Sequence, residues 1–350
     1  ATDGTSKLKS LIKAGVNVFR LNFSHGNHGD HLKRITNIRS VANEVGCNVA
    51  ILADLQGPKF RIGEVKSDIK VIKGNNYIFD KNTEIGDFSR VNLSHDEIYE
   101  SLSIGSNILM DDGKLQFVVK KISKDKINTE VVVGGYIKSN KGINLPDVVI
   151  NTNPLTPKDI EDLKFILNQD VDWIALSFVQ KLSDVEEVKK YIGDKAGVIA
   201  KIEKPSALKE LKSIIGACEG IMVARGDLGV ELPPEKVPGI QKEIILECRQ
   251  AGKPVIVATQ MLESMIDSPS PTRAEASDVA TAVFDGADAV MLSAETAVGL
   301  FPTEAVTIMD RIICSAEKHI KSHRGDGPQN LKVENFVYNA VSHSAVSLAE

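Results

Sequence analysis

The sequence predicts an α/β fold in which parallel strands alternate with helices and close into a (β/α)8 barrel, the TIM-barrel arrangement. Short apolar runs recur about every 23 to 35 residues, with charged helical patterns such as 183–192 and 240–252 between them. Such alternation is typical of βαβ units and a parallel sheet. The runs lie at 16–24, 49–57, 172–179, 197–203, 220–227, 254–261 and 289–295.

These seven strands leave an eight-stranded barrel one short. The chain opens on a helical stretch at 5–15, so we expect the missing strand just before residue 1. An open doubly wound sheet is the alternative, because it has the same alternation of strands and helices. The expected barrel occupies residues 1–58 and 150–322.

Residues 59–149 have a different texture and predict an inserted β-rich, barrel-like domain after the third barrel strand. They are rich in Val, Ile, Gly and Asn, with turn signals such as Asp112-Gly113 and strand-like pieces at 76–80, 115–122 and 127–137. Pro58 and Pro146 bracket the insertion as hinges. A polar linker at 321–330 and a helical pattern at 333–350 predict that residues 323–350 begin a C-terminal α/β domain.

Composition excludes several classes of protein. The chain has 350 residues, of which 42% are hydrophobic and 25% charged, so it is not disordered. A net charge of −5 and 5% aromatic residues argue against a nucleic-acid partner. No apolar run approaches the roughly 20 residues of a membrane span. Four scattered cysteines without a CxxC pair argue against zinc ribbons and disulfides and indicate a cytoplasmic protein.

The end of the first predicted strand carries a polar face. Arg20, Asn22 and Ser24 alternate with Leu21 and Phe23, so the apolar pair should face the helices and the polar trio the barrel interior. A buried polar trio is costly unless it serves a function. The alternative is an ordinary strand end with Arg20 bridging to a neighbouring acid.

Two further strand ends carry carboxylates. Lys201 and Glu203 share the inward face of one strand, and Asp227 follows the next strand. Two carboxylates without a histidine are typical of a Mg²⁺ or Mn²⁺ site that is open to substrate oxygens. Lys201 is a compact positive charge that suits a phosphoryl group or an enolate oxygen. The alternative is a purely structural Lys–Glu pair.

Smaller groups complete the predicted rim. Gly226 allows close backbone approach to a ligand, and Thr259 offers a hydroxyl at the end of its strand. Ser293 and Glu295 lie two residues apart after the last strand and would relay a proton through water. Packing and capping are the alternative roles for that last pair.

Other motifs are weak or missing. His25, His28 and His31 are spaced three apart, but a Gly-rich stretch at a strand end is better read as solvated loop and helix-start histidines than as a zinc site. Neither GxxxxGK[ST] nor GxGxxG occurs, so a P-loop kinase and a Rossmann dehydrogenase lose their main support.

Long motifs give the sequence a close resemblance to the pyruvate kinase family. It holds in order from residue 1 to about 320 and implies a barrel, an inserted lid domain and a C-terminal regulatory domain. It further implies a glycolytic, cytoplasmic, homotetrameric phosphotransferase that converts phosphoenolpyruvate and ADP to pyruvate and ATP with Mg²⁺ or Mn²⁺. The motifs are RLNFSHG (20–26), ADLQGPKFR (53–61), MDDGKL (110–115), NKGINLP (140–146), AKIEKP (200–205), MVARGDLGVELP (222–233), ATQMLESM (258–265), SPTRAEASDVA (270–280) and GADAVMLSAET (286–296).

The resemblance also implies a role for each rim residue. Glu203 and Asp227 match the divalent-metal ligands, and Lys201 the group that stabilises the transferring phosphoryl and the enolate. The other implied roles are substrate phosphate for Arg20, substrate carboxylate and proton delivery for Gly226, Asp227 and Thr259, a water relay for Ser293 and Glu295, and nucleotide contact for Asn22, Phe23, Ser24, His25, Arg61 and Lys141.

One position departs from the K⁺-dependent members of the family. Those members hold K⁺ at positions matching Asn22, Ser24, Asp54 and Leu55, and they usually carry a glutamate where this chain has Lys59. We hypothesise that the Lys59 ammonium takes the electrostatic role of the monovalent ion, so that K⁺ is not required. The alternative is that Lys59 points to solvent and K⁺ still binds.

Two other functions stay open at this stage. A Mg²⁺-dependent enolate lyase or aldolase would use the same paired acids on the same barrel, without needing the lid, Arg61 or Lys141. A non-catalytic fragment is the third reading, because a missing barrel strand exposes a sheet edge. Dependence on ADP separates the first two.

Overall fold

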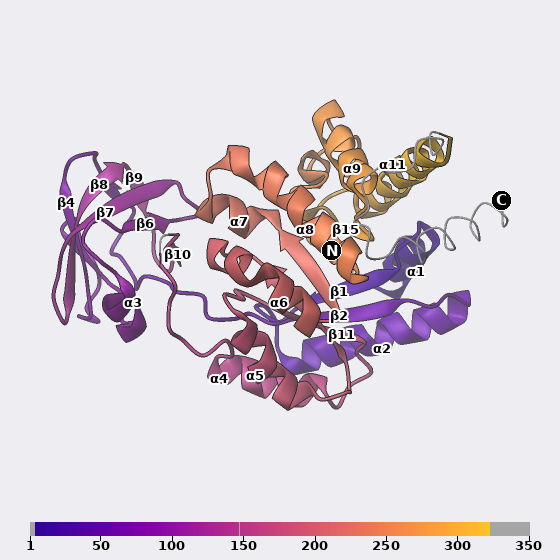
Figure 1. Cartoon of the computed structure of the whole chain (residues 1–350), viewed down its shortest axis with the longest axis horizontal. Coiled ribbons are helices and arrows are strands. Elements are labelled where there is room, and N and C mark those ends of the chain that lie inside the picture. The colour runs from indigo at the N-terminus through magenta and orange to yellow at the C-terminus, as the bar shows by residue number, and fades with distance from the viewer. Residues whose placement is uncertain (1–3, 147, 323–350) are drawn as a thin grey trace, which may run out of the picture.

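Seven parallel strands form one curled sheet whose carboxyl ends carry the predicted site. The structure is a computed structural model that describes residues 4–146 and 148–322 (Figure 1). The seven strands are those that the sequence predicts, which confirms the α/β fold class. Among the described residues, the first and last strands of the sheet do not pair with each other. The order is β1 (Val18–Asn22), β2 (Ala50–Asp54), β11 (Trp173–Leu176), β12 (Gly197–Ile202), β13 (Gly220–Ala224), β14 (Val255–Ala258) and β15 (Ala289–Met291).

Helices cover the outer face of the sheet, and their starts are written in the sequence. Three begin at capping boxes, in which an N-cap side chain and the side chain three residues later satisfy each other's backbone N–H groups: Asn27 with Asp30, Thr156 with Asp159, and Thr272 with Glu275. The barrel helices are α1 (Thr5–Lys13), α2 (His28–Val45), α4 (Pro157–Ile166), α5 (Leu182–Ile192), α6 (Leu211–Ala217), α7 (Arg225–Glu231), α8 (Val237–Ala251), α9 (Arg273–Asp285), α10 (Ala294–Ala297) and α11 (Pro302–Ser322), with short 3₁₀ turns at Pro205–Glu210, Pro234–Lys236 and Glu263–Ile266.

Strand alternation divides the barrel core into two apolar layers. Ile51 and Ala53 of β2 join the large cluster between sheet and helices, whereas Leu52 joins a smaller cluster on the inner face. The inner cluster fills the barrel below the polar rim, so the rim is closed from beneath. Its buried members are Leu52, Ala175, Ile199, Met222 and Ala258.

A second sheet with its own apolar core lies between β2 and β11 in the chain. The predicted strands at 76–80 and 115–122 are present with those bounds. The sheet order is β10 (Ile143–Asn144), β6 (Asn107–Met110), β7 (Leu115–Ile122), β8 (Lys126–Val133), β4 (Asn76–Asp80) and β5 (Arg90–Asn92); β3 (Ile69–Val71) pairs with β9 (Gly135–Ile137), and α3 (Asp96–Ser101) follows β5.

The predicted strand at 127–137 is divided in two, which corrects the sequence-based expectation. β8 ends at Val133, and β9 leaves the large sheet to pair with β3. Gly134 marks the break, because a Cβ there would lie 2.6 Å from the carbonyl oxygen of Val71. Only glycine permits so close an approach of two backbones.

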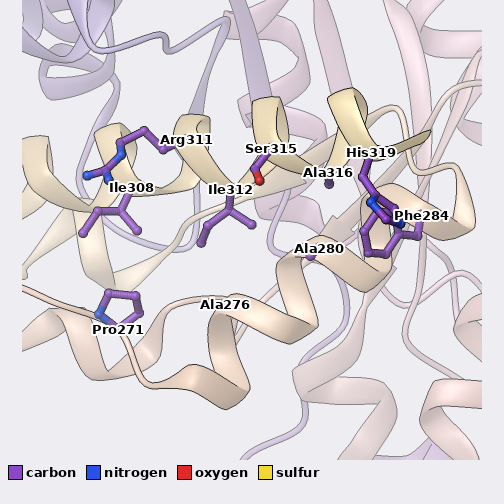
Figure 2. Close-up of a pocket in the computed structure, with 10 residues that line it drawn as sticks. All are labelled: Pro271, Ala276, Ala280, Phe284, Ile308, Arg311, Ile312, Ser315, Ala316 and His319. Atoms are coloured by element: carbon purple, nitrogen blue, oxygen red, sulfur yellow. The ribbon is translucent and has the colours of Figure 1, made fainter. Parts of the chain in front are cut away.

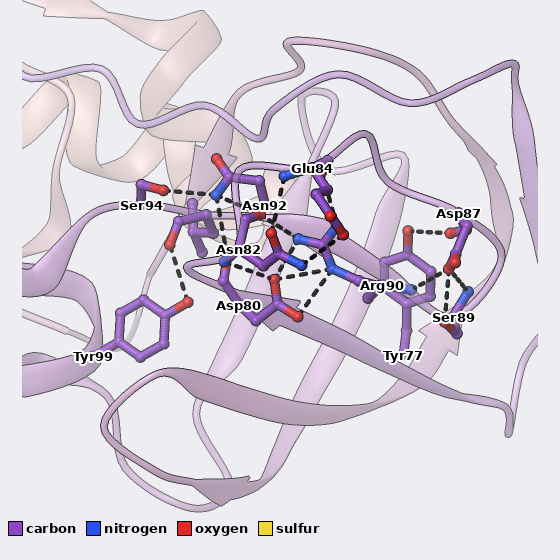
Figure 3. A network of polar contacts seen from close by, with 11 residues as sticks. Tyr77, Asp80, Asn82, Glu84, Asp87, Ser89, Arg90, Asn92, Ser94 and Tyr99 are labelled. Atoms are coloured by element: carbon purple, nitrogen blue, oxygen red, sulfur yellow. Dashed lines mark hydrogen bonds and ion pairs between the residues drawn. The ribbon is translucent and has the colours of Figure 1, made fainter.

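A polar network secures the unusual parallel pair β4–β5 (Figure 3). Arg90 Nε lies 3.0 and 2.9 Å from the two carboxylate oxygens of Asp80, and Arg90 Nη1 donates to the carbonyl of Glu84 at 2.9 Å. Asn92 Nδ2 donates to the carbonyl of Asn82 at 2.9 Å. These bonds fix the connection at 81–89, which joins two parallel strands without a crossover helix.

The two sheets meet where the chain enters and leaves the second one. Arg61 and Gly142 form an isolated antiparallel bridge, and the amide of Ile62 donates to the carbonyl of Lys141 at 3.0 Å. β10 then brings the chain back beside the barrel (Figure 1). Within the described part of the chain, no helix has the length and apolarity needed to cross a membrane. The predicted C-terminal domain start, residues 323–350, lies outside the described residues.

Candidate active site

A buried ion cluster occupies the carboxyl ends of β1, β2 and β12. Lys201 Nζ lies 3.2 Å from Asp54 Oδ1 and 2.9 Å from Glu203 Oε1. Arg20 Nε donates to Asp54 Oδ2 at 2.6 Å. The inward face predicted for Arg20, Lys201 and Glu203 is therefore present, and so are the ion pairs that the structural alternatives expect.

Electrostatics keep the Lys201 and Asp54 pair ionised. Burial alone would raise the pKa of Asp54, but the charges of Lys201 and Arg20 outweigh burial and hold that pKa below its ordinary value. Burial would likewise lower the pKa of Lys201, but Glu203 and Asp54 raise it. The Lys201 ammonium therefore stays a cation within the cluster.

Glu203 has a surplus of negative charge beside it. Burial raises the pKa of Glu203, the Lys201 charge opposes that rise, and the Asp227 carboxylate raises the pKa further. Glu203 is 1% exposed, so water cannot screen the repulsion. Two neighbouring carboxylates, one of them raising the pKa of the other, match the donor set of a hard divalent cation such as Mg²⁺ or Mn²⁺. The residues present thus fit such an ion.

The backbone around Asp227 is held by strained neighbours. Thr259 has a φ of 71° and Gln260 a φ of 54°, in the left-handed region that a β-branched residue such as Thr259 rarely adopts. Thr259 Oγ1 accepts from the amide of Gly226 at 2.7 Å. A Cβ on Gly226 would lie 3.3 Å from that hydroxyl, a tight contact that favours glycine here. Backbone strain of this kind is typical of functional sites.

A cleft of about 690 Å³ opens over this strained segment. The turn between β6 and β7 contributes Asp112 to its wall, so the second sheet's turn lines the cleft together with helices and loops of the barrel. Two predicted site residues, Gly226 and Asp227, face it. The other lining residues are Arg225, Gly229, Val230, Pro234, Val237, Pro238, Gln241, Lys242, Gln260, Asp278, Thr281 and Asp285.

Ser293 and Glu295 lie together but are used differently. Glu295 accepts from the amide of Leu262 at 3.1 Å and from the amide of Ser293 at 2.7 Å, which is the capping role that the alternative expects. Ser293 Oγ is buried without a hydrogen-bond partner in the described part of the chain. An unpaired buried hydroxyl is a binding point for water. The relay stays a prediction.

The predicted nucleotide residues fall into two groups. Asn22 ends β1, and Phe23, Ser24 and His25 follow it, whereas Arg61 and Lys141 lie on neighbouring segments at the second sheet. Lys141 Nζ is 2.7 Å from Asp111, and Arg61 donates to the carbonyl of Asn140 at 3.1 Å. Among residues 4–146, no hydrogen bond or ion pair joins the side chains of the two groups.

Phe23 requires a correction within that set. Its side chain is 1% exposed and stacks on His31 with ring centroids 4.0 Å apart, so the ring belongs to the core and cannot contact a nucleotide. His28 lies 2.7 Å from Asp162. The described residues contain no group of three or more His, Cys, Asp or Glu side chains that could hold one metal ion.

The predicted monovalent-cation residues are only partly assembled. The side chain of Asn22 accepts from the amide of Ser24 at 3.0 Å, and the carbonyl of Leu55 accepts from Ser177 at 2.7 Å. Asp54 is neutralised by Lys201 and Arg20. Lys59 is exposed, and its ammonium makes no ion pair within the described residues. Lys59 thus points to solvent, as the alternative expects. That the enzyme does not require K⁺ remains a prediction.

Sequence reasoning missed three supporting residues. Ser177 accepts from Lys201 Nζ at 2.9 Å, and the amide of Phe178, at a φ of 57°, donates to Glu203 at 2.7 Å. Arg225 is bound to Asp278 at 2.6 Å and to the carbonyl of Thr259 at 2.7 Å. Ser177 was findable as a polar residue at a strand end; the Arg225–Asp278 pair spans 53 residues and has no local signal.

A second cavity, of about 630 Å³, lies between α9 and α11 (Figure 2). Its wall is mostly apolar and includes none of the predicted site residues. The lining residues are Pro271, Ala276, Ala280, Phe284, Ile308, Arg311, Ile312, Ser315, Ala316 and His319.

Comparison with known proteins shows the family of the chain. The family described as pyruvate kinase, barrel domain, matches residues 1–306. A pyruvate kinase of Agrobacterium vitis is 53% identical over 321 residues, which cover 91% of this chain and 68% of that protein. One of Methylorubrum extorquens is 50% identical over 91% of this chain and 67% of its own length, and pyruvate kinase 2 of Synechocystis is 44% identical over 99% and 60%. The chain belongs to the pyruvate kinase family.

Proposed function

We propose that the polar rim of the curled sheet is where this phosphotransferase moves a phosphoryl group from phosphoenolpyruvate to ADP. The observation that carries the proposal is the buried Glu203 carboxylate, which lies beside the Lys201 ammonium and is influenced by the half-buried Asp227 carboxylate at the cleft. Phosphoryl transfer needs positioning and neutralisation of charge more than covalent help from the protein. The rim provides both.

Each residue of the rim has a task in this proposal. Glu203 and Asp227 hold a divalent ion, which supplies charge neutralisation at the transferring phosphoryl. Lys201 stabilises the phosphoryl oxygens and the enolate that remains when the P–O bond breaks. Arg20, oriented by Asp54, holds the substrate phosphate. Gly226, Asp227 and Thr259 hold the substrate carboxylate.

The reaction ends when the enolate is protonated at carbon to give pyruvate. Thr259 lies on the proton-delivery side, and the unpaired hydroxyl of Ser293 supports a water-mediated supply of that proton. Glu295 orients Ser293 by accepting from its amide. Asn22, Ser24, His25, Arg61 and Lys141 contact the nucleotide, with Phe23 contributing backbone only.

The second sheet, residues 59–149, acts as a lid in this proposal, with residues 1–58 and 150–322 as the barrel. The wall that Asp112 adds to the cleft supports it, because a small movement of the β6–β7 turn would close the opening. Closure excludes water from the reacting groups. By family resemblance, we expect the enzyme to work in the cytoplasm. We also expect a homotetramer, and light scattering would test this oligomeric state.

Pyruvate formation from phosphoenolpyruvate with Mg²⁺ tests the proposal, with and without ADP. We expect strict ADP dependence and loss of activity in Glu203→Gln and Asp227→Asn. Glu219→Gln is the control, since Glu219 binds the opposite end of β12. Pyruvate and free phosphate formed without ADP would show that the phosphoryl group goes to water, and would contradict transfer to ADP. Inactivity with phosphoenolpyruvate and ADP both bound would leave a binding role.

The same assay in K⁺-free buffer tests the hypothesis for Lys59. If Lys59 replaces the monovalent ion, activity is unaffected by K⁺, and Lys59→Glu makes it K⁺-dependent. Activity that collapses without K⁺ in the unaltered chain would assign the ion to the pocket of Asn22, Ser24, Asp54 and Leu55.

A further inference from the structure

A buried ion pair lies next to the proposed metal site but belongs to none of the assigned roles. Lys204 Nζ donates to Glu231 Oε1 at 2.9 Å, and both residues are buried, at 7% and 5% exposure. A buried Lys–Glu pair is costly to desolvate and contributes little net stability, so its presence calls for another explanation.

The pair joins the two chain segments that carry the proposed metal ligands. Lys204 directly follows Glu203 at the end of β12. Glu231 is the last residue of α7, four positions after Asp227, and residues four apart lie on one face of a helix. Glu203 and Asp227 repel each other, whereas Lys204 and Glu231 attract. The attracting pair therefore lies beside the repelling pair. Lys204 is one residue from Glu203, and Glu231 is one helical turn from Asp227.

The Lys204–Glu231 pair also contacts β10 of the second sheet and the residue that follows this strand. Glu231 Oε1 also accepts from Asn144 Nδ2 of β10 at 2.9 Å, and Lys204 Nζ lies 3.4 Å from the carbonyl of Leu145. Glu231 Oε2 is buried without a partner in the described part of the chain. Strand β12, helix α7 and the returning chain therefore meet at one carboxylate.

We propose that Lys204 and Glu231 are positioning residues that hold Glu203 and Asp227 close enough to bind one divalent ion. This rests on the proposed function, in which Glu203 and Asp227 are the metal ligands. The Lys204–Glu231 pair then preorganises the site before the ion arrives. Residues behind metal ligands typically change metal affinity by 10- to 100-fold when altered. Asn144 makes the second sheet part of the same unit.

The sign of one effect separates positioning from simple electrostatics. Lys204→Met removes a positive charge next to the site, so electrostatics alone would tighten binding of a cation. Positioning predicts the opposite, a loss of affinity of about 10-fold or more. Binding of Mn²⁺ measured by electron paramagnetic resonance without substrate gives this value independently of turnover.

A matched pair on the same strand serves as the control. Lys189 Nζ lies 2.6 Å from Glu219 Oε1, and Glu219 accepts from the amide of Val198 near the start of β12. Lys189→Met removes the same charge at the far end of β12. We expect it to leave Mn²⁺ affinity within about twofold, well under the 10-fold scale of residues behind metal ligands.

The double variant Lys204→Met with Glu231→Met separates positioning from stability. Removing both charges leaves no lone buried ion, so urea unfolding should return toward the unaltered protein. We expect Mn²⁺ affinity to stay about 10-fold weakened. Affinity that returns with stability, or tighter binding in Lys204→Met, would overturn the inference. Unchanged Mn²⁺ affinity in Glu203→Gln would instead reject the metal-ligand assignment.

Discussion

The two buried charge networks of this protein differ in how well their charges are matched. In the second sheet, the Arg90 guanidinium donates hydrogen bonds to Asp80 and to two carbonyl groups. At the barrel rim, Glu203 faces both the Lys201 cation and the Asp227 anion. In the first, closed network the Arg90 donors all have acceptors within the network. In the second, unmatched network the Asp227 carboxylate adds a negative charge beside Glu203.

The backbone next to the two networks shows the same contrast, since no residue of 80–92 has a positive φ, although Asp111, Asp112 and Asn140 elsewhere in the second sheet do. Phe178, Thr259 and Gln260 adopt positive φ angles at the ends of barrel strands, where no glycine relieves the strain. The closed network accounts for a structural requirement, which is to hold the connection between β4 and β5. Unmatched charge and backbone strain together mark a site that is kept for function at a cost in stability.

Breaking the closed network should give the largest effect. Arg90→Met leaves the Asp80 carboxylate buried without its cation, and removing one partner of a buried pair costs about 3–5 kcal/mol. Urea unfolding, monitored by far-ultraviolet circular dichroism, measures the loss of stability. The kcat of the folded fraction should stay unchanged, and a lowered kcat would give this network a catalytic role.

Breaking the unmatched network should instead affect the reaction. Lys201→Met removes a preorganised cation, and losses of this kind lower kcat by about 10²–10³-fold. Steady-state kinetics with phosphoenolpyruvate and ADP give the value. Lys189→Met serves as the control, because Lys189 lies outside the rim. A rise in KM with unchanged kcat would show that Lys201 only binds substrate.

The strained segment offers a smaller and sharper test. Thr259→Val removes the acceptor of the Gly226 amide, and an unpaired buried group costs about 1–3 kcal/mol. Thr259→Ser keeps the hydroxyl and loses the β-branch, so we expect near-normal unfolding and turnover. Equal losses in both variants would show that the methyl group holds this segment as much as the hydroxyl does, and would contradict the expectation for Thr259→Ser.

The smallest effect concerns an exposed pair of the second sheet. The hydrogen bond from Lys141 lowers the pKa of Asp111 below its ordinary value of 3.8. The pair therefore stabilises the fold above pH 3.8 and loses that contribution as pH falls through the lowered pKa. Lys141→Met should cost under about 1 kcal/mol at pH 7 and nothing in strong acid. A difference that persists in acid would reject this ion pair.

The position of the rim could be predicted because its signals are local. Period-two alternation separates Arg20 from Leu21 and Lys201 from Ile202, and the structure confirms both separations. Capping boxes and the turn at Asp112-Gly113 also involve residues within a few positions of each other. Such patterns report the face of a strand or the start of a helix without knowledge of its neighbours.

Sequence alone thus determined the alternation of strands and helices, the inward face of each strand end and the turns of the second sheet. Only the tertiary structure decided the parallel β4–β5 pair, the support of Lys201 by Ser177, the strained φ of Thr259 and the meeting of Lys204 with Glu231 and Asn144. The physical reason is distance along the chain. A contact such as Asn144 with Glu231 joins residues 87 positions apart, and its energy exists only once the elements that carry them have packed.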